Sequence, residues 1–349
     1  MAGDGADLET DVLVVGGGPV GLAAAIEARR AGLGVVVLEP RAAPIDKACG
    51  EGLMPGTLVA VRRLGIDPPG WPLRGISYRQ DGAVADHRFG DGPGRGVRRT
   101  SLHAALHAAA LDAGATVLAR RAAAVVQDAE GVATAGVRAR WLLGCDGLHS
   151  RVRREAGLEA GAAGRGTARP RRYGLRRHFR VPPWSDLVEV HWGPRAEAYV
   201  TPVAEDLVGV ALLGPPGTDF ATELATLPEL AERVAGARPD GPVRGAGPLR
   251  VRSTARTAGR VRLVGDASGY VDALTGEGLR VGLAQARAVV AHLDDPAGYE
   301  RAWARATREV RLLTAGLVAA AASPLRRRVV PAAVRAPGLY GAVVERLAR

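Results

Sequence analysis

The sequence predicts an α/β fold in which strand–helix units are interrupted by a mostly antiparallel β region and followed by C-terminal helices. Largely apolar runs at residues 11–15, 35–38 and 261–264 each end at a glycine or an acidic residue, which is typical of buried strands that lead into tight turns. Other short runs alternate with a period of two or are apolar throughout, and they predict the antiparallel, half-buried region: residues 75–78, 188–191, 197–202 and 207–213.

The segment near the C-terminus has a helical pattern from residue 299 to about 322. Pro324, Pro331 and Pro337 follow it and predict a series of shorter helices, because proline lacks the backbone N–H that continues a helix. The longest apolar run, near residues 312–322, is too short to span a bilayer.

A glycine-rich motif follows the first predicted strand. Gly16, Gly18 and Gly21 have the spacing G-x-G-x-x-G, and Pro19 opens an Ala- and Leu-rich helix. Gly16 permits the tight turn, Gly18 lets the backbone approach a pyrophosphate, and Gly21 lets the helix pack closely on the strand. The helix N-terminus offers unpaired N–H groups and a partial positive charge to the phosphates. The motif therefore predicts a dinucleotide, although a glycine-rich turn without a nucleotide is the alternative.

An acidic residue ends the next predicted strand. Glu39 follows the run 35–38, and Arg41 lies two residues beyond it. A carboxylate in this position accepts hydrogen bonds from both hydroxyls of an adenosine ribose and repels a 2′-phosphate. Glu39 thus favours FAD or NAD over NADP, and we assign Arg41 to the same nucleotide.

Two later motifs narrow the choice of cofactor. Asp146 and Gly147 follow a second apolar run, and Gly265 and Asp266 follow the run 261–264. A glycine-rich turn comes after the second pair: Gly276, Glu277, Gly278 and Leu279. In this order, the three motifs resemble those of the para-hydroxybenzoate hydroxylase-like superfamily of flavoproteins. The resemblance covers about residues 11–290.

The resemblance implies non-covalent FAD and a role for each motif. Asp266 would hold a ribityl hydroxyl, Asp146 would lie near the pyrophosphate, and Arg99 would meet a phosphate or the ribityl chain. The turn at Gly276 and Gly278–Leu279 would place a helix N-terminus against N1 and the C2 carbonyl of the flavin, where its dipole stabilises negative charge.

The order of the motifs predicts a discontinuous organisation like that of the group A flavin monooxygenases. The Rossmann-like FAD-binding domain would comprise residues 1–70, 96–160 and 250–295. An inserted, mostly antiparallel β substrate domain would comprise residues 71–95 and 161–249, followed by a C-terminal helical segment at 296–349. In the family, the inserted sheet forms a roof over the substrate and the flavin. Within the insert, a stretch rich in Gly, Arg and Pro (161–172) is expected to be a mobile loop.

The loop around Lys47 carries a second resemblance. The chain has 47 Lys and Arg residues, and Lys47 is the one lysine among them. Because a lysine is a point charge and an arginine a planar fork, its retention suggests a role beside the flavin or the substrate, with chance retention on a solvated loop as the alternative. The loop continues with Cys49, Gly50 and Glu51, which resembles the geranylgeranyl reductase branch. We expect these three residues to meet substrate, and a cation beside Cys49 to lower the pKa of its thiol.

The predicted strand 197–202 departs from that branch. Reductases of the branch carry Tyr-x-Trp-x-Phe-Pro, and flavin halogenases carry Trp-x-Trp-x-Ile-Pro. Here Pro202 is kept, and Tyr199 is the one aromatic residue. The strand looks more like that of bacterial polyketide hydroxylases, and we expect Tyr199 and Pro202 to contact substrate.

These patterns together predict an FAD-dependent monooxygenase. It would use NAD(P)H and O₂ to hydroxylate an aromatic or phenolic, lipophilic precursor of a secondary metabolite. An ene reductase of the geranylgeranyl reductase type, acting on a prenyl-like lipid, is the alternative, and a flavin-binding protein without turnover is a third. NAD(P)H would bind transiently, because the chain has a single G-x-G-x-x-G motif.

No catalytic residue follows from the sequence. Lys47, Tyr199 and Glu277 are candidates, and Glu197 and Asp272 are further candidates for a base. For Tyr199, Glu197, Asp272 and Glu277, a packing or rim position is the favoured alternative.

Composition excludes several other classes. The formal charge of +11 comes with 4% aromatic residues and no DNA-binding motif, which argues against nucleic acid. Cys49 and Cys145 provide no disulfide framework, and His103 and His107 lack the glutamate of a zinc-protease helix, so we expect no metal. The N-terminus lacks the pattern of a signal peptide, which favours the cytoplasm.

The C-terminal segment 324–349 mixes six arginines and one glutamate with apolar residues. Such a segment can lie in a membrane interface, so peripheral contact with a lipid surface is one hypothesis. The alternative is that its apolar residues pack back on the FAD domain. The oligomeric state does not follow from the sequence.

Overall fold

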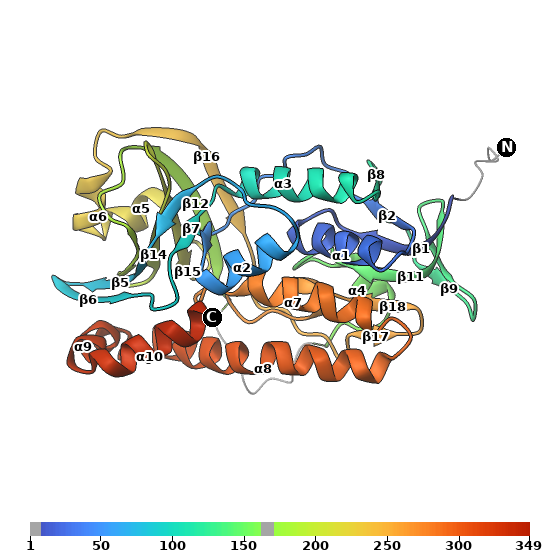
Figure 1. The fold of residues 1–349 in the computed structure, drawn as a ribbon. Helices are drawn as coiled ribbons and strands as arrows, with labels where there is room; N and C mark the ends of the chain where they lie inside the picture. Colours follow the sequence, from blue (N-terminus) through green and yellow to red (C-terminus); the bar gives the residue numbers. More distant parts are fainter. Residues whose placement is uncertain (1–7, 162–170) are drawn as a thin grey trace.

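The computed structural model describes residues 8–161 and 171–349, arranged in two lobes joined along one side by a long helix (Figure 1). The predicted mobile loop falls mostly outside the described residues, as does the N-terminal segment 1–7.

The first lobe contains the parallel sheet. Its strands, in spatial order, are β17 (Thr257–Ala258), β18 (Val261–Leu263), β11 (Val137–Gly144), β1 (Leu8–Val15), β2 (Val35–Leu38) and β8 (Thr116–Leu118), with β9 (Val126–Gln127) and β10 (Val132–Thr134) beside β11. Strands β18, β11, β1, β2 and β8 pair in parallel. The strands that precede the three sequence motifs, β1, β11 and β18, therefore end at the same edge of one sheet, where ligands bind in open α/β sheets.

Alternation along β1 explains how this sheet is covered. Val12 and Val14 point to one face, into a core shared with helices α1 (Pro19–Arg30), α3 (Arg99–Asp112) and α7 (Gly278–Ala291). Leu13 and Val15 point to the other face, into a core with β10, β11 and the short helix α4 (Arg151–Glu155). A strand that is buried on both faces is apolar throughout, as the run in β1 predicted.

The second lobe contains a seven-stranded sheet, the roof sheet. Its strands, in spatial order, are β16 (Arg238–Ala246), β12 (Tyr173–Arg180), β15 (Leu207–Gly214), β14 (Glu197–Ala204), β13 (Leu187–Trp192), β5 (Gly75–Gln80) and β6 (Ala83–Arg88). All neighbours are antiparallel except β13 and β5. The prediction of an α/β fold with an inserted, mostly antiparallel sheet is confirmed.

The prediction of half-buried strands is wrong for the centre of the roof sheet. Every residue of β13 is buried, and so is nearly every residue of β14 and β15. One face packs on helices α5 (Phe220–Ala225) and α6 (Pro228–Arg233), which lie on the outer side of the sheet (Figure 1). The other face packs toward the first lobe and the C-terminal helices, so neither face is solvated.

Smaller elements connect the lobes. Strands β3 (Gly52–Leu53), β7 (Gly94–Gly96) and β4 (Trp71–Leu73) form a third sheet. In the chain, helix α2 (Pro55–Arg63) lies between β3 and β4. A 3₁₀ turn, η1 (Gly265–Ser268), follows β18.

The C-terminal segment forms helices α8 (Pro296–Ala321), η2 (Pro324–Arg328), α9 (Val329–Arg335) and α10 (Pro337–Ala348). Pro331 does not separate two helices, because it lies in the first turn of α9, where its missing N–H would have no intrahelical partner. Helices α9 and α10 pack on β5 and β6, and α10 also reaches α2. The expectation that residues 324–349 pack back on the FAD domain is therefore wrong for most of that stretch, because the inserted sheet provides the apolar surface, whereas α8 packs on α7.

Candidate active site

One cavity of about 1080 Å³ lies between the strand ends of the parallel sheet and the roof sheet. Its wall includes residues from all three sequence motifs, from the loop around Lys47, from the roof sheet and from α9 and α10. The cavity is large enough for a dinucleotide and an additional small molecule.

The glycine motif forms a bare turn at one side of this cavity. Gly16 has φ = +105°, a conformation that side chains disfavour. A Cβ atom on Gly21 would lie 1.9 Å from the carbonyl oxygen of Gly16, so the helix approaches this turn as closely as glycine permits. A Cβ on Gly18 would meet nothing within 4 Å, and Gly18 and Pro19 line the cavity at the N-terminus of α1. The turn therefore leaves open space where phosphates would lie.

Glu39 lies beside the turn, buried to 5% exposure. Its carboxylate accepts hydrogen bonds from the backbone N–H of Gly17 at 3.0 Å and from Nε and Nη2 of Arg41 at 2.8 and 2.9 Å. Burial raises the pKa of Glu39, but Arg41 and Gly17 more than compensate, so the pKa is lower than usual. The backbone N–H of Arg41 donates to the same carboxylate at 3.1 Å, so the chain's own donors fill its roughly four acceptor positions, and a ligand hydroxyl that binds there would replace the exposed Arg41 side chain.

Two buried polar atoms of residues in the cavity wall lack hydrogen-bond partners among the described residues. Asp146 Oδ2 accepts hydrogen bonds from the backbone N–H groups of Arg151 and Val152, whereas its buried Oδ1 has no partner among the described residues. Arg99 is buried at the start of α3, and its Nη1 is also without a partner there. Both residues line the cavity. Because buried polar groups are costly when unsatisfied, these atoms point to a polar ligand.

Asp266 and Lys47 meet across the cavity wall, with Lys47 Nζ 4.0 Å from Asp266 Oδ2. Burial raises the pKa of Asp266, although the cations Lys47 and Arg99 act in the opposite direction. Gly265 precedes the aspartate with φ = +65°. The loop around Lys47 thus lies next to the motif that the resemblance assigns to the ribityl chain.

The turn before α7 contributes Gly276, Gly278 and Leu279 to the cavity wall. Glu277 is not in this wall. Its side chain is buried and forms an ion pair with Arg280, and burial raises its pKa to about 7 despite that arginine. The expectation that Glu277 serves as a catalytic group in the cavity is therefore not supported by its position, since the first turn of the helix directs it away.

The loop residues Cys49, Gly50 and Glu51 all line the cavity. The expectation of a lowered thiol pKa is wrong. The Cys49 side chain is exposed at the cavity, but desolvation by the protein around it raises the pKa of its thiol, with Arg99 acting in the opposite direction and Glu51 adding to the rise. Cys49 is therefore a neutral thiol in this environment.

Glu51 connects the loop to the roof sheet, a role that sequence reasoning missed. It is buried with φ = +61°, and its carboxylate accepts the backbone N–H of Arg99 at 2.8 Å and lies 2.6 Å from His178 Nε2. Arg176 Nη1 lies 2.9 Å from His178 Nδ1. A guanidinium can only donate, so Nδ1 accepts and the His178 proton resides on Nε2, where it is donated to Glu51. Arg176 also forms an ion pair with Asp46, so β12 holds both ends of the loop.

The alternating pattern Arg176-x-His178-x-Arg180 was the available signal for this connection, because β12 directs all three side chains to one face. The partners, however, lie more than a hundred residues away in the chain.

The roof sheet covers the cavity with Tyr78, Val188, Val190, Tyr199 and Leu213, among others. The hydroxyl of Tyr199 donates a hydrogen bond to the carbonyl oxygen of Leu274 at 2.9 Å. Burial raises the pKa of Tyr199 well above its usual value, so this residue cannot serve as a base near neutral pH. Its neighbourhood in the cavity is otherwise apolar.

Other residues of the predicted strand point elsewhere. Pro202 is absent from the cavity wall, and its carbonyl oxygen packs against Gly96. Glu197 is buried in a cluster with Arg172 and Arg326, and Arg172 also pairs with Asp272. Substrate contact by Pro202 and base roles for Glu197 and Asp272 therefore do not agree with these positions.

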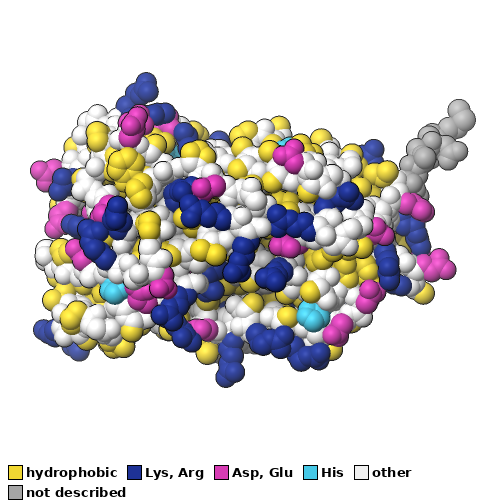
Figure 2. Space-filling model, viewed as in Figure 1, with side chains coloured by type: hydrophobic (Ala, Val, Ile, Leu, Met, Phe, Trp, Pro, Cys, Tyr) yellow, Lys and Arg dark blue, Asp and Glu magenta, His cyan; other side chains and the backbone are white. Residues whose placement is uncertain are grey.

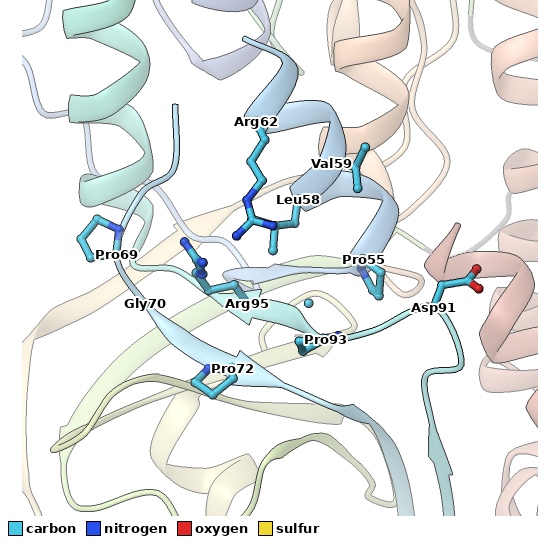
Figure 3. Close-up of a pocket in the computed structure, with 11 residues that line it drawn as sticks. Pro55, Leu58, Val59, Arg62, Pro69, Gly70, Pro72, Asp91, Pro93 and Arg95 are labelled. Carbon is cyan, nitrogen blue, oxygen red and sulfur yellow. The ribbon is translucent and has the colours of Figure 1, made fainter. Parts of the chain in front are cut away.

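A second cavity, of about 510 Å³, opens on the surface between α2, β4 and β7 (Figure 3). Arg62 and Arg95 reach toward it, and both form ion pairs with Asp67. Its charges are balanced by these pairs, and it contains none of the predicted site residues.

Within residues 8–161 and 171–349, no group of three or more His, Cys, Asp or Glu side chains could hold a metal ion. None of the helices described there is long and apolar enough to cross a membrane.

Comparison with known proteins agrees with the site. A model of the FAD binding domain matches residues 9–69 and 103–203. Digeranylgeranylglycerophospholipid reductase 1 of Methanopyrus kandleri is 33% identical over 307 residues, which cover 79% of this chain and 78% of that protein. The chain belongs to the para-hydroxybenzoate hydroxylase-like superfamily of FAD-dependent oxidoreductases.

Other similarities are shorter or more distant. Menaquinone reductase of Mycolicibacterium smegmatis is 39% identical over 117 residues, a match that covers 31% of this chain and only 28% of that relative's length. The crystal structure of p-nitrophenol 4-monooxygenase PnpA from Pseudomonas putida DLL-E4 superposes with a TM-score of 0.76 at 20% identity, covering 97% of this chain and 95% of that one. This last likeness establishes the shared fold.

The site fits FAD. Gly18 leaves room for a pyrophosphate, Asp146 Oδ1 and Arg99 Nη1 lack partners, and the N-termini of α1 and α7 both line the cavity. Helix N-termini attract negative charge, as the phosphates and the reduced isoalloxazine would carry. The chain belongs to a superfamily of FAD-dependent oxidoreductases, and these residues would hold the cofactor.

Proposed function

We propose that the protein is a monooxygenase that uses NAD(P)H and O₂ to hydroxylate an aromatic or phenolic, lipophilic precursor of a secondary metabolite. The observation that carries the proposal is the apolar space between the FAD-binding residues and the roof sheet. Tyr78, Val190, Tyr199 and Leu213 cover it from above. An aromatic ring fits a chamber of this chemistry, and the bound FAD would supply electron transfer and oxygen activation.

The protein's own groups would orient the substrate and exclude water. The Tyr199 hydroxyl donates to Leu274, so its remaining lone pair can accept the hydrogen bond of a phenolic hydroxyl. The buried strands of the roof sheet would keep bulk water from the reacting ring, which limits the unproductive loss of activated oxygen as hydrogen peroxide. In this proposal Lys47 contributes a positive charge near Asp266 at the flavin, and Cys49 and Gly50 form the adjacent wall.

An ene reductase acting on a prenyl-like lipid is the second candidate. The identity with the Methanopyrus kandleri reductase over most of both chains favours it. The cavity wall supplied by α9 and α10 is also apolar, as a prenyl chain requires. The strand 197–202 argues against the reductase, because it has one aromatic residue, Tyr199, where the reductases of that branch carry an aromatic-rich signature.

The FAD-loaded protein with a 5-alkylresorcinol as probe distinguishes the two. We expect the phenol to accelerate NADH or NADPH oxidation in air, and ¹⁸O from labelled O₂ to appear in the product. Tyr199→Phe should raise KM for the phenol more than it lowers kcat, with Tyr173→Phe in β12, which is outside the cavity wall, as the control. Anaerobic reduction of geranylgeraniol, with no oxygen transfer to any phenol, would instead establish the reductase.

A further inference from the structure

The wide end of the cavity opens at the junction of helices α9 and α10. Ala332, Ala336 and Leu339 line the cavity and are also exposed to solvent, and Leu339 is 69% exposed. Residues that belong both to a cavity wall and to the outer surface mark its mouth. This mouth is formed by small and apolar side chains.

The opposite end of the same cavity is charged. Glu39, Arg41, Arg151 and Arg154 line it there, beside the glycine turn. The polar part of the cofactor belongs at that end, since its phosphates and ribose need these partners. The apolar mouth at α9 and α10 is therefore free to admit a different, apolar molecule.

Exposed apolar side chains also occur on α9 and on its neighbours η2 and α10. Leu325 in η2 is 56% exposed and Val334 in α9 is 47% exposed, in addition to Leu339 in α10. Exposed arginines accompany them: Arg327, Arg328 and Arg335 have no ion-pair partner among the described residues. We name these six residues the mouth surface.

The charge of this region has one sign. No acidic residue occurs between Glu309 and Glu345, a stretch that includes the end of α8 and all of η2 and α9. Figure 2 shows basic side chains along the lower edge of the molecule, where α8 and α9 lie, with apolar side chains among them. Asp86 on β6 is an acidic neighbour of Tyr340, but the stretch itself is apolar and basic, and such a stretch complements a membrane with anionic headgroups.

Buried contacts hold the mouth surface in place. Arg326 lies between Leu325 and Arg327, and its guanidinium donates to the carbonyl oxygen of Gly193 at 2.6 Å and pairs with Glu197 at 2.6 Å. Beyond Leu339, the hydroxyl of Tyr340 donates to the carbonyl oxygen of Ile76 at 3.2 Å. Because the residues on either side are anchored to the roof sheet, the mouth surface is a fixed feature rather than a loose tail.

We propose that the mouth surface docks on anionic membranes, so that a lipophilic substrate passes from the bilayer into the cavity between α9 and α10. The proposal rests on the proposed function for the nature of the substrate only. Leu325, Val334 and Leu339 enter the headgroup boundary, and the three arginines contact lipid phosphates.

Vesicle flotation of the FAD-loaded protein tests the docking without any substrate. We expect the protein to float with vesicles of phosphatidylcholine and phosphatidylglycerol at low salt, to bind pure phosphatidylcholine weakly, and to dissociate from the anionic vesicles in 0.5 M salt. Replacing Arg327, Arg328 and Arg335 by Gln should weaken binding on the order of 100-fold, because each basic residue near an anionic surface contributes about fivefold. Replacing Leu325, Val334 and Leu339 by Ser should abolish the weak binding to pure phosphatidylcholine and also weaken binding to the anionic vesicles at low salt, because these side chains bury apolar surface at the headgroup boundary.

Matched variants provide the control. Exposed residues elsewhere are available for it: Arg63, Arg238 and Arg287 to Gln, and Leu8, Leu111 and Val126 to Ser. The control set has the same change in charge and apolar surface, so it should bind as the wild type does, and retained FAD absorbance shows that each variant is folded. Failure to float at low salt, or equal loss in both sets, overturns the proposal.

A protein partner is the competing outcome. If the chain ignores vesicles but forms a dimer that the mouth-surface variants dissociate, the surface is an interface between copies and the membrane proposal is wrong. Flotation requires no turnover, so its failure leaves the hydroxylation experiment unaffected. Conversely, vesicle binding by a protein that transfers no oxygen would reject the monooxygenase but not the docking.

Discussion

At the scale of single residues, two carboxylates of the cofactor lobe have opposite electrostatic environments. Glu39 has a lowered pKa, because the hydrogen bonds from Arg41 and Gly17 outweigh its burial. Glu277 has a raised pKa, because its burial outweighs Arg280. The first is suited to bind a ligand as an anion, whereas the second is close to half protonated near neutral pH.

Glu39→Ala is expected to weaken FAD binding. The carboxylate is positioned for the adenosine ribose, and one or two charge-assisted hydrogen bonds contribute ~1.5–3 kcal/mol each. Titration of the apoprotein with FAD, followed by quenching of flavin fluorescence, measures the loss. The exposed Glu232→Ala is the control. Unchanged affinity in Glu39→Ala would show that the ribose binds elsewhere.

Glu277→Gln is expected to change how stability depends on pH. The carboxyl pKa is about 7 in the folded protein, above its ordinary value of 4.5. The stabilising contribution of the protonated group is therefore complete below pH 4.5 and is lost as the pH rises through 7. Glutamine does not titrate, so the free energy of unfolding of the variant should fall less over this interval, by up to about 3 kcal/mol.

Urea unfolding at pH 5 and pH 7.5 measures this difference. Glu232→Gln, at an exposed position, should follow the wild type at both pH values. Parallel pH profiles for Glu277→Gln and the wild type would mean that Arg280 keeps the carboxylate ionised throughout.

At the scale of elements, the loop 46–51 is attached to two parts of the fold at once. Glu51 joins the start of α3 through Arg99 and joins β12 through His178. Thr201 in β14 donates a further hydrogen bond to the carbonyl oxygen of Gly50 at 2.8 Å. The loop is thus a shared wall between the cofactor lobe and the roof sheet, and its geometry depends on both.

His178→Leu is expected to disrupt this wall, whereas His178→Gln should largely preserve it. Leucine removes one donor from the buried Glu51 carboxylate, and a buried acceptor left without its hydrogen bond typically costs about 1–3 kcal/mol, with larger values for charged groups. A glutamine amide can accept from Arg176 and donate to Glu51, as the neutral imidazole does. The FAD affinity and the thermal unfolding of both variants show whether glutamine replaces the imidazole and leucine does not. Equal effects of the two substitutions would indicate that the imidazole acts through packing alone.

At the scale of the whole molecule, the C-terminal segment is attached to the roof sheet by a buried charge cluster. Glu197 in β14 pairs with Arg172 and with Arg326 of η2, and Arg326 lies near the ring of Trp192, 5.8 Å from its centroid. Burial raises the pKa of Glu197, while the two arginines act against it. The cluster explains how a segment with three prolines keeps a defined position against the cavity.

Arg326→Met is expected to destabilise the protein by about 3–5 kcal/mol, because it removes one of two cations from a buried carboxylate. The double variant Glu197→Gln with Arg326→Met should recover part of this loss, since no buried charge then lacks its partner. Urea unfolding of the two single variants and the double variant gives the coupling energy. Additive effects would show that the pair contributes nothing beyond packing.

The sequence by itself determined the strands, the turns and the cofactor. The glycine motif at Gly16–Gly21 depends on local backbone conformation, and Gly16 and Gly265 adopt the positive φ values that glycine permits. The run 35–38 matches β2 residue for residue, because a strand buried on both faces is apolar throughout. Such features are readable because their cause lies within a few neighbouring residues.

Only the tertiary structure decided which side chains face the cavity and how they are charged. Glu277 and Pro202 share their segments with cavity residues, yet their backbone directs them away. The Cys49 pKa is raised because desolvation by the surrounding protein outweighs the cation Arg99, and desolvation cannot be read from a loop sequence. The pairing of Glu51 with His178 and the mouth at α9 and α10 join residues far apart in the chain. Their positions depend on how two sheets pack, and no local pattern encodes that packing.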